Sequence, residues 1–212
     1  MPARGFHVIV PPEYRRLGCL PAEQFIPQLM ERRGEPYYVG LLSAAQYHGA
    51  AHHRPQEFQV LVERNRNPIE CGAVRVAFIA RKAVADVPTL ILNTPRGVMR
   101  LSTAEATAVD LAGYPAHAGG WDGVATVLAE LAEKLDGKKL VEAVKNAPLP
   151  WSQRLGYLLE LGGSSPCTEP LAAYVQARAR EYVPLATGAP IVNATRSTRW
   201  RLRVNATVEA DA

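Results

Sequence analysis

Three histidines form the pattern in this chain that comes nearest to metal chemistry. His48 and His52 are four residues apart and would share one helix face, with His53 beside them. Gly49 and Pro55 indicate, however, that the helix ends here, and no carboxylate of matching spacing follows. Because a zinc site needs three or four ligands in defined geometry, we expect no metal site. The other interpretation is a histidine at a helix C-terminus, favourable with the helix dipole, and two surface histidines.

The remaining candidates for catalysis are carboxylates, serines and glycines. A metal-dependent nuclease needs clustered carboxylates and a lysine to hold the metal and activate water. No serine lies in a Gly-x-Ser-x-Gly elbow, and Gly119-Gly120 is typical of a turn entering a helix. We therefore expect no enzyme and no cofactor, with a nuclease as a remote alternative. The carboxylates near the expected strands lack the Asp…Glu-x-Lys spacing: Glu57, Glu63, Glu70 and Asp86.

The positions of the basic side chains are more informative than the net charge of +4. They interrupt the region of expected strands and recur in the C-terminal tail, at Arg196, Arg199, Arg201 and Arg203. Basic strands can bind phosphates or an acidic protein, although they are also found as ordinary solvated faces. The candidate surface for a partner or a nucleic acid comprises Arg64, Arg66, Arg75, Arg81, Lys82 and Arg100.

The composition is typical of a soluble globular protein. Of the 212 residues, 48% are hydrophobic and 21% are charged, and no apolar run reaches the roughly 18 residues of a membrane span. The N-terminal apolar stretch is too short for a signal peptide. Cys19, Cys71 and Cys167 are odd in number and widely spaced, which predicts free thiols in a reducing cytoplasm rather than a disulfide framework.

Short regular segments make up the first half of the chain. A strand is predicted at 5–10, and a helix at 21–33, which Pro27 should kink or split. The apolar run 38–48 predicts a buried helix. Ser102 and Glu105 have the spacing of a capping box, which predicts a helix over 103–112. Strands are predicted at 58–62, 74–79, 89–93 and 98–101, the last two joined as a hairpin by a type I turn at Thr94-Pro95-Arg96-Gly97.

The second half is mainly helical. Apolar residues at helical spacing predict helices near 124–135, 140–144, 155–159 and 171–175. In the tail, Trp200, Leu202 and Val204 alternate with arginines, as in one half-buried strand. The predicted fold class is therefore α+β: a small, mainly antiparallel sheet with helices before it and a helical C-terminal half.

Three blocks of the sequence together resemble the C-terminal domain of AbiE-type antitoxins, from the type IV toxin–antitoxin systems of abortive infection. The middle block is the most specific, with a hairpin, Ser102-Thr103-x-Glu105-x-Thr107, Asp110-Leu111 and then Gly119-Gly120. The blocks are YYVGLLSAAQYHGAAHHRPQEFQVLV (37–62), NTPRGVMRLSTAEATAVDLAGYPAHAGGWDGVATVLAELAE (93–133) and PLPWSQRLGYLLE (148–160).

The resemblance implies a non-catalytic antitoxin that counters a nucleotidyltransferase toxin, directly or indirectly. A full member also has an N-terminal winged helix-turn-helix that binds operator DNA, so a DNA-binding repressor of its own operon is the alternative function. Here GFHVIVPPEYR resembles only the closing wing strand and linker, so we expect most of the winged helix to be missing, in a fragment, a chain with a misplaced start or a natural short form. The expected divisions are a wing remnant at 1–20, the antitoxin domain at 21–183 and an extended basic tail at 184–212.

Overall fold

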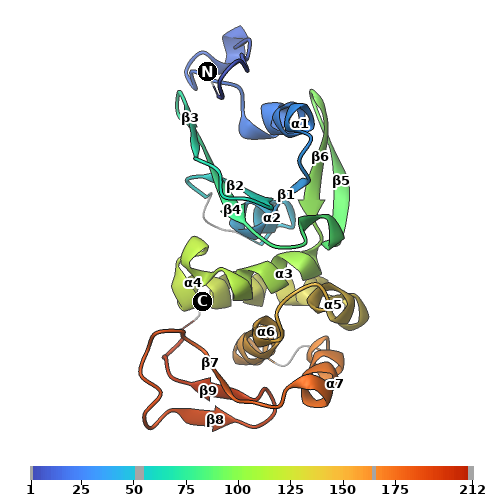
Figure 1. Ribbon diagram of the computed structural model, residues 1–212, viewed down its shortest axis with the longest axis vertical. Helices are drawn as coiled ribbons and strands as arrows, with labels where there is room; N and C mark the ends of the chain where they lie inside the picture. The colour runs from blue at the N-terminus through green and yellow to red at the C-terminus, as the bar shows by residue number, and fades with distance from the viewer. Residues whose placement is uncertain (1, 51–54, 164–165, 210–212) are drawn as a thin grey trace. The chain divides into compact units, whose positions relative to one another are not determined.

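A computed structural model describes residues 2–50, 55–163 and 166–209 of the chain (Figure 1). These residues form two compact units. Unit 1 comprises Met1–Ala44 and His53–Thr103, and unit 2 comprises Ala45–His52 and Ala104–Ala212. Unit 1 contains a six-stranded sheet, whereas unit 2 contains most of the helices and a three-stranded sheet. The α+β class predicted from the sequence is confirmed.

The six-stranded sheet of unit 1 has the order β3-β4-β2-β1-β6-β5. Three of its neighbouring pairs are antiparallel, and the pairs β2–β4 and β1–β6 are parallel. The predicted hairpin is β5–β6, with Thr94 paired to Gly97. The strands are β1 (Tyr37–Val39), β2 (Phe58–Val62), β3 (Ile69–Cys71), β4 (Val74–Ala80), β5 (Thr89–Thr94) and β6 (Gly97–Ser102).

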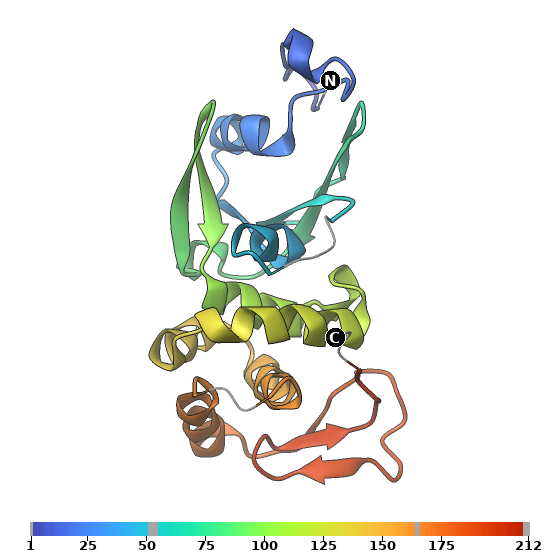
Figure 2. The ribbon, with the colours of Figure 1, turned by 180° about the vertical axis from the view of Figure 1, so that it is seen from behind.

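Helix α1 (Ala22–Arg33) lies across the concave face of this sheet, between β3 and the β5–β6 hairpin (Figures 1 and 2). Its buried Phe25, Ile26 and Met30 form the main core of unit 1 with strand residues that include Val60 and Val76. The assigned helix continues through Pro27, its sixth residue, although proline has no N–H to donate to the Glu23 carbonyl one turn earlier.

Helix α2 (Leu41–Tyr47) follows β1 directly. Within unit 1, its Ala44 packs with Val39, Met99 and Leu101 in a second buried cluster. The Ser43 hydroxyl accepts a hydrogen bond from the Gln59 N–H at 2.9 Å and thereby joins the helix to strand β2. The chain passes from unit 1 to unit 2 inside this helix and again after β6.

Unit 2 is organised around helix α6 (Leu149–Leu161), which contacts each of the other long helices of the unit and strand β9. Asp136 caps α5, because its carboxylate accepts from the N–H groups of Lys138 and Lys139, both at 2.9 Å. The helices around α6 are α3 (Ala104–Gly113), α4 (Gly120–Leu131), α5 (Gly137–Val144) and α7 (Thr168–Arg178). Short 3-10 turns occur at Pro12–Tyr14, Val84–Asp86, Pro115–His117 and Ala132–Lys134.

The C-terminal tail forms a small sheet rather than the one strand predicted. Its order is β7 (Val183–Pro184), β9 (Leu202–Val204) and β8 (Thr195–Ser197). Trp200 and Leu202 are fully buried, and the Trp200 indole N–H donates to the Glu160 carboxylate of α6 at 2.6 Å. The tail is therefore anchored to the central helix of unit 2.

Several local predictions were wrong. Residues 38–39 belong to strand β1, not to a helix, because β2 and β6 pair with them from both sides. Of the predicted strand at 5–10, only an isolated bridge between Ala3 and Phe6 is present in the described residues. Ser102 is the last residue of β6 and donates to the Val39 carbonyl at 3.3 Å, and the helix predicted over 103–112 is α3, which begins at Ala104.

The cysteines also differ from the prediction. Cys19 and Cys71 form a disulfide, with their Cα atoms 5.6 Å apart and a sequence separation of 52, whereas Cys167 is free and buried. The residues before β1 bring Cys19 to the β3–β4 turn, where the Ala73 N–H donates to the Leu17 carbonyl at 2.8 Å. Sequence spacing gives no sign of this approach.

Across the described residues, no helix has both the length and the apolar character needed to cross a membrane.

Candidate partner-binding groove

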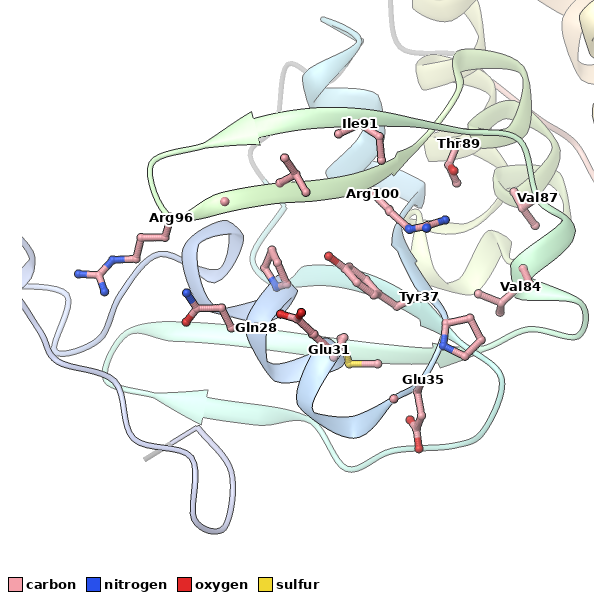
Figure 3. Close-up of a pocket in the computed structure, with 17 residues that line it drawn as sticks. Gln28, Glu31, Glu35, Tyr37, Val84, Val87, Thr89, Ile91, Arg96 and Arg100 are labelled. Atoms are coloured by element: carbon pink, nitrogen blue, oxygen red, sulfur yellow. The ribbon is translucent and has the colours of Figure 1, made fainter.

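A groove of about 740 Å³ lies in unit 1 between α1 and the β5–β6 hairpin (Figure 3). One wall is the exposed side of α1 with the loop that follows it, and the other is the hairpin together with residues 84–87. The side chains that project toward it include Gln28, Glu31, Tyr37, Ile91, Val98 and Arg100.

The alternation of side chains along the hairpin makes the groove face both apolar and basic. Met99 and Leu101 are buried in the core, so Val98 and Arg100 lie on the opposite side of β6. Ile91 is the direct cross-strand partner of Arg100. Ile91 and Val98 are 57% and 53% exposed, which is high for large aliphatic residues on a sheet face.

Tyr37 lies at the base of the groove, beside Arg100 (Figure 3). Burial raises the pKa of its phenol above the ordinary value of 10; a hydrogen bond with the Arg100 backbone and the Arg100 charge oppose this rise, and Glu31 adds to it. Tyr37 is therefore a neutral hydrogen-bonding group at physiological pH. Arg100 is exposed, and it has no ion pair with another described residue.

Arg96 extends from the tip of the hairpin at the open side of the groove (Figure 3). It is exposed and, like Arg100, forms no ion pair within the described ranges. The acidic residue Glu35 lines the groove from the loop after α1, but it is neutralised by an ion pair with Arg66. The groove thus presents two unpaired guanidinium groups and the exposed Glu31 carboxylate beside two exposed aliphatic side chains.

The structure does not bring the six predicted basic residues together. Arg100 lies in the groove and Arg66 is paired at its rim. Arg64 and Lys82 are exposed, two residues beyond the aligned ends of β2 and β4, so they lie at the same end of the sheet. Arg75 is exposed on the side of β4 that faces away from α1, since Val74 and Val76 face α1.

Arg81 differs from the other predicted basic residues in being buried. Its side chain is buried, with the residue only 4% exposed, and its guanidinium donates to the Lys82 carbonyl at 3.0 Å. Its backbone continues the sheet directly after β4, since its N–H donates to the Val62 carbonyl at 2.8 Å.

Sequence reasoning missed Arg96, Ile91 and Val98. The sequence did indicate which hairpin side chains could be exposed, because in the predicted strands 89–93 and 98–101 every second side chain lies on the face opposite the core. What the sequence lacked was the position of α1, which covers the middle of the sheet and leaves the hairpin side open.

The lining of the groove combines charged, hydrogen-bonding and apolar side chains. Neither here nor elsewhere in the described ranges do three or more His, Cys, Asp or Glu residues gather as metal ligands. Of the three histidines considered above, His52 and His53 lie outside the described residues, and the His48 carbonyl accepts a hydrogen bond from Lys134. What the groove can do is bind a partner segment through charge, hydrogen bonds and apolar contact.

Comparisons with known proteins identify a family and a shared fold. A family model described as the AbiEi antitoxin C-terminal domain matches residues 38–161. The crystal structure of the RV2827C protein from Mycobacterium tuberculosis aligns with 95% of this chain and 73% of its own, at 19% identity and a TM-score of 0.65, which shows a shared fold. No curated protein matches the chain.

The AbiEi antitoxin family has an antitoxin role in abortive infection, and its members are generally non-catalytic. Because the family model covers more than half of the sequence, this chain belongs to the AbiEi antitoxin C-terminal domain family.

Proposed function

We propose that this chain counters a nucleotidyltransferase toxin in the cytoplasm, and that it does so by binding an acidic, partly apolar segment of that toxin in the groove of unit 1. Membership of the antitoxin family supports a toxin as the partner in general. The identity of the toxin as a nucleotidyltransferase follows from the sequence resemblance alone.

The observation that carries the proposal is the combination of exposed Ile91 and Val98 with unpaired Arg96 and Arg100 on one groove wall. Covering the exposed half of each aliphatic side chain would contribute about 1 kcal/mol apiece. The two guanidinium groups would attract an acidic partner and orient it during association. Arg64 and Lys82, exposed at the end of the sheet, extend the basic character of unit 1 beyond the groove.

Growth rescue tests the proposal. The chain is expressed with the toxin encoded beside it, and the double variant Arg96→Glu with Arg100→Glu is compared with the original. We expect rescue by the original chain and loss of rescue by the variant, with binding of purified toxin reduced at least tenfold. Charge reversal is suitable because both side chains are exposed and make no ion pair in the described structure.

The matched control is Arg15→Glu with Arg16→Glu. These arginines are also exposed and also belong to unit 1, but neither lines the groove. The control should rescue growth and bind toxin normally. Rescue by the groove variant, with no measurable toxin binding by either chain, would show indirect antagonism and contradict the groove as a docking site. Binding to operator DNA that falls steeply with salt would favour the repressor alternative.

A further inference from the structure

A second basic surface lies in unit 2, on the outward face of the C-terminal sheet. We call it the arginine face; it comprises Arg196, Arg201, Arg203 and Tyr182. Arg196 on β8 and Arg203 on β9 are direct cross-strand partners. The guanidinium carbons of Arg196 and Arg201 lie 5.5 Å and 5.7 Å from the centroid of the Tyr182 ring. These four residues lie on or directly beside the strands of the sheet formed by β7, β9 and β8, which Figures 1 and 2 show as a ribbon.

None of these three arginines forms an ion pair with an acid in the part of the chain that the structure describes. Arg199, only two residues from Arg201, shows the contrast. Its guanidinium pairs with Glu160 at 2.7 Å and with Glu169 at 2.6 Å. The tail thus contains one arginine neutralised by carboxylates of helices α6 and α7, and three arginines without an ion pair in the described structure, of which Arg196 is exposed and Arg201 and Arg203 are half-buried.

Placing Arg196 directly opposite Arg203 is unfavourable in the free chain. Side chains of a cross-strand pair have their Cβ atoms about 5 Å apart, and like charges at that spacing destabilise a sheet. Stacking on Tyr182 offsets part of this cost, since an aromatic face attracts a guanidinium. A guanidinium has five N–H donors, so Arg196 and Arg203 keep donors for an anion, whereas the Nε–H of Arg201 is buried without a hydrogen-bond partner. An anion bound between the arginines would remove the repulsion.

The opposite face of the same sheet is firmly held, which keeps the arginines in place. Trp200 and Leu202 are fully buried and alternate with Arg201 and Arg203. The Gln153 side chain of α6 donates to the Arg201 carbonyl at 2.8 Å and to the Glu181 carbonyl at 3.2 Å. The positions of the charges are therefore set by the buried core of unit 2.

We propose that the arginine face binds the phosphate backbone of a single-stranded nucleic acid. Planar guanidinium groups bind phosphate oxygens bidentately, and both guanidinium and tyrosine planes can stack on unpaired bases. Basic side chains interleaved with an aromatic ring on a strand surface are typical of sequence-tolerant single-strand binding. Reading a duplex would instead favour a helix that enters the major groove, and the arginine face is built from strands and their flanking residues.

Fluorescence anisotropy with the full chain tests this proposal. The probes are a labelled 12-nucleotide RNA, the DNA strand of the same sequence and the corresponding duplex. Each phosphate contact on a single strand contributes about −0.7 to the slope of log K against log salt, so three arginines give about −2. Affinity should then fall about 20-fold between 50 and 200 mM salt. The RNA and DNA arms distinguish which single strand is preferred.

The variant Arg196→Gln with Arg203→Gln removes the cross-strand pair. It should bind the single strand at least about tenfold more weakly, with a slope near −0.7, since two charge-assisted contacts are lost. The matched control, Lys138→Gln with Lys139→Gln, removes two exposed charges from α5 in the same unit and should leave both values unchanged. The pair Arg196→Lys with Arg203→Lys should keep the slope but weaken binding, because lysine lacks the planar fork.

A melting measurement on the same proteins provides an independent readout. At low salt, the glutamine variant should melt at the same temperature as the original chain or higher, because the like-charge pair is gone. Equal nucleic-acid binding by the folded glutamine variant would overturn the proposal. So would preference for the duplex, or tighter binding to a polyglutamate peptide than to either strand. None of these outcomes depends on the toxin, so failure here is distinct from failure of the proposed antitoxin function.

Discussion

Replacing Gly156 with alanine should destabilise unit 2, because this glycine lies directly beneath the ring of Trp200. Gly156 is buried in the middle of α6, and a Cβ there would overlap three carbons of the benzene portion of the Trp200 ring. Trp200 is fully buried, and its indole N–H is held by Glu160 at 2.6 Å. The ring therefore cannot move aside without losing a charge-assisted hydrogen bond or shifting strand β9.

Two opposing effects determine how much the Gly156→Ala substitution changes the free energy of unfolding. Alanine is a better helix former than glycine by about 1 kcal/mol. Forcing an extra carbon into a well-packed core costs about 1–3 kcal/mol, and losing the bond to Glu160 would add about 1.5–3 kcal/mol. We expect a net loss of about 1–3 kcal/mol in the free energy of unfolding.

Urea unfolding followed by far-UV circular dichroism measures this change as a lower midpoint with an unchanged slope. Gly162→Ala is the matched control, since a Cβ at the end of the same helix would make an ordinary 3.4 Å contact with Ala129. The double variant with Trp200→Phe should lose less than the sum of the two single changes, because the overlapping ring carbons are removed. A Gly156→Ala protein as stable as the original would refute this account of how α6 holds the C-terminal sheet.

Three further predictions concern individual groups. Burial raises the pKa of Tyr37, so the folded state favours its neutral form. The stability contributed by this preference is complete below pH 10 and is lost as the pH rises through the higher pKa of the folded state. Tyr37→Phe should therefore make the melting temperature depend less on pH in the alkaline range, and an unchanged dependence would contradict the prediction. Hydrogen bonds from the backbone N–H groups of Lys139 and Lys138 lower the pKa of Asp136. The stability that its carboxylate contributes is therefore present above the ordinary pKa near 4 and is lost as the pH falls through the lower pKa of the folded state. Asp136→Ala should lower the melting temperature at pH 7, whereas Asp136→Asn should keep most of the capping stabilisation. Thiol titration of the oxidised, denatured chain should count one thiol, Cys167, and titration after reduction should count three. Reduction should lower the free energy of unfolding by roughly 4 kcal/mol, because the disulfide closes a loop with a sequence separation of 52. Three thiols before reduction would exclude the disulfide.

Local patterns in the sequence were sufficient for much of the fold. Strand β2 matches its predicted range, and β4, β5 and β6 lie within one residue of theirs. Helices α4 to α7 contain the leucines and valines that predicted them, except Leu135, which follows the 3-10 turn after α4. These elements are set by periodicity and by turn or break residues between them, which act over a few neighbours and can be read directly.

Elements that depend on distant partners were not predictable in this way. Tyr37–Val39 is a strand because β2 and β6 lie on either side of it, although its apolar run continues without a break into α2. Strands β7 and β8 are too short to show a period and exist because β9 pairs with both. Cys19 and Cys71 are joined across 52 residues, a distance at which spacing carries no information.

By itself, the sequence determined the α+β class, the helical second half and the resemblance to AbiEi antitoxins, because composition, periodicity and motif spacing are properties of neighbouring residues. Only the tertiary structure decided which positive charges can act. Arg81 is buried, Arg66 and Arg199 are neutralised by carboxylates, and Arg100 and Arg203 remain unpaired within the described residues. An arginine has the same charge in each of these places, and its availability depends on burial and on carboxylates brought to it from elsewhere in the chain.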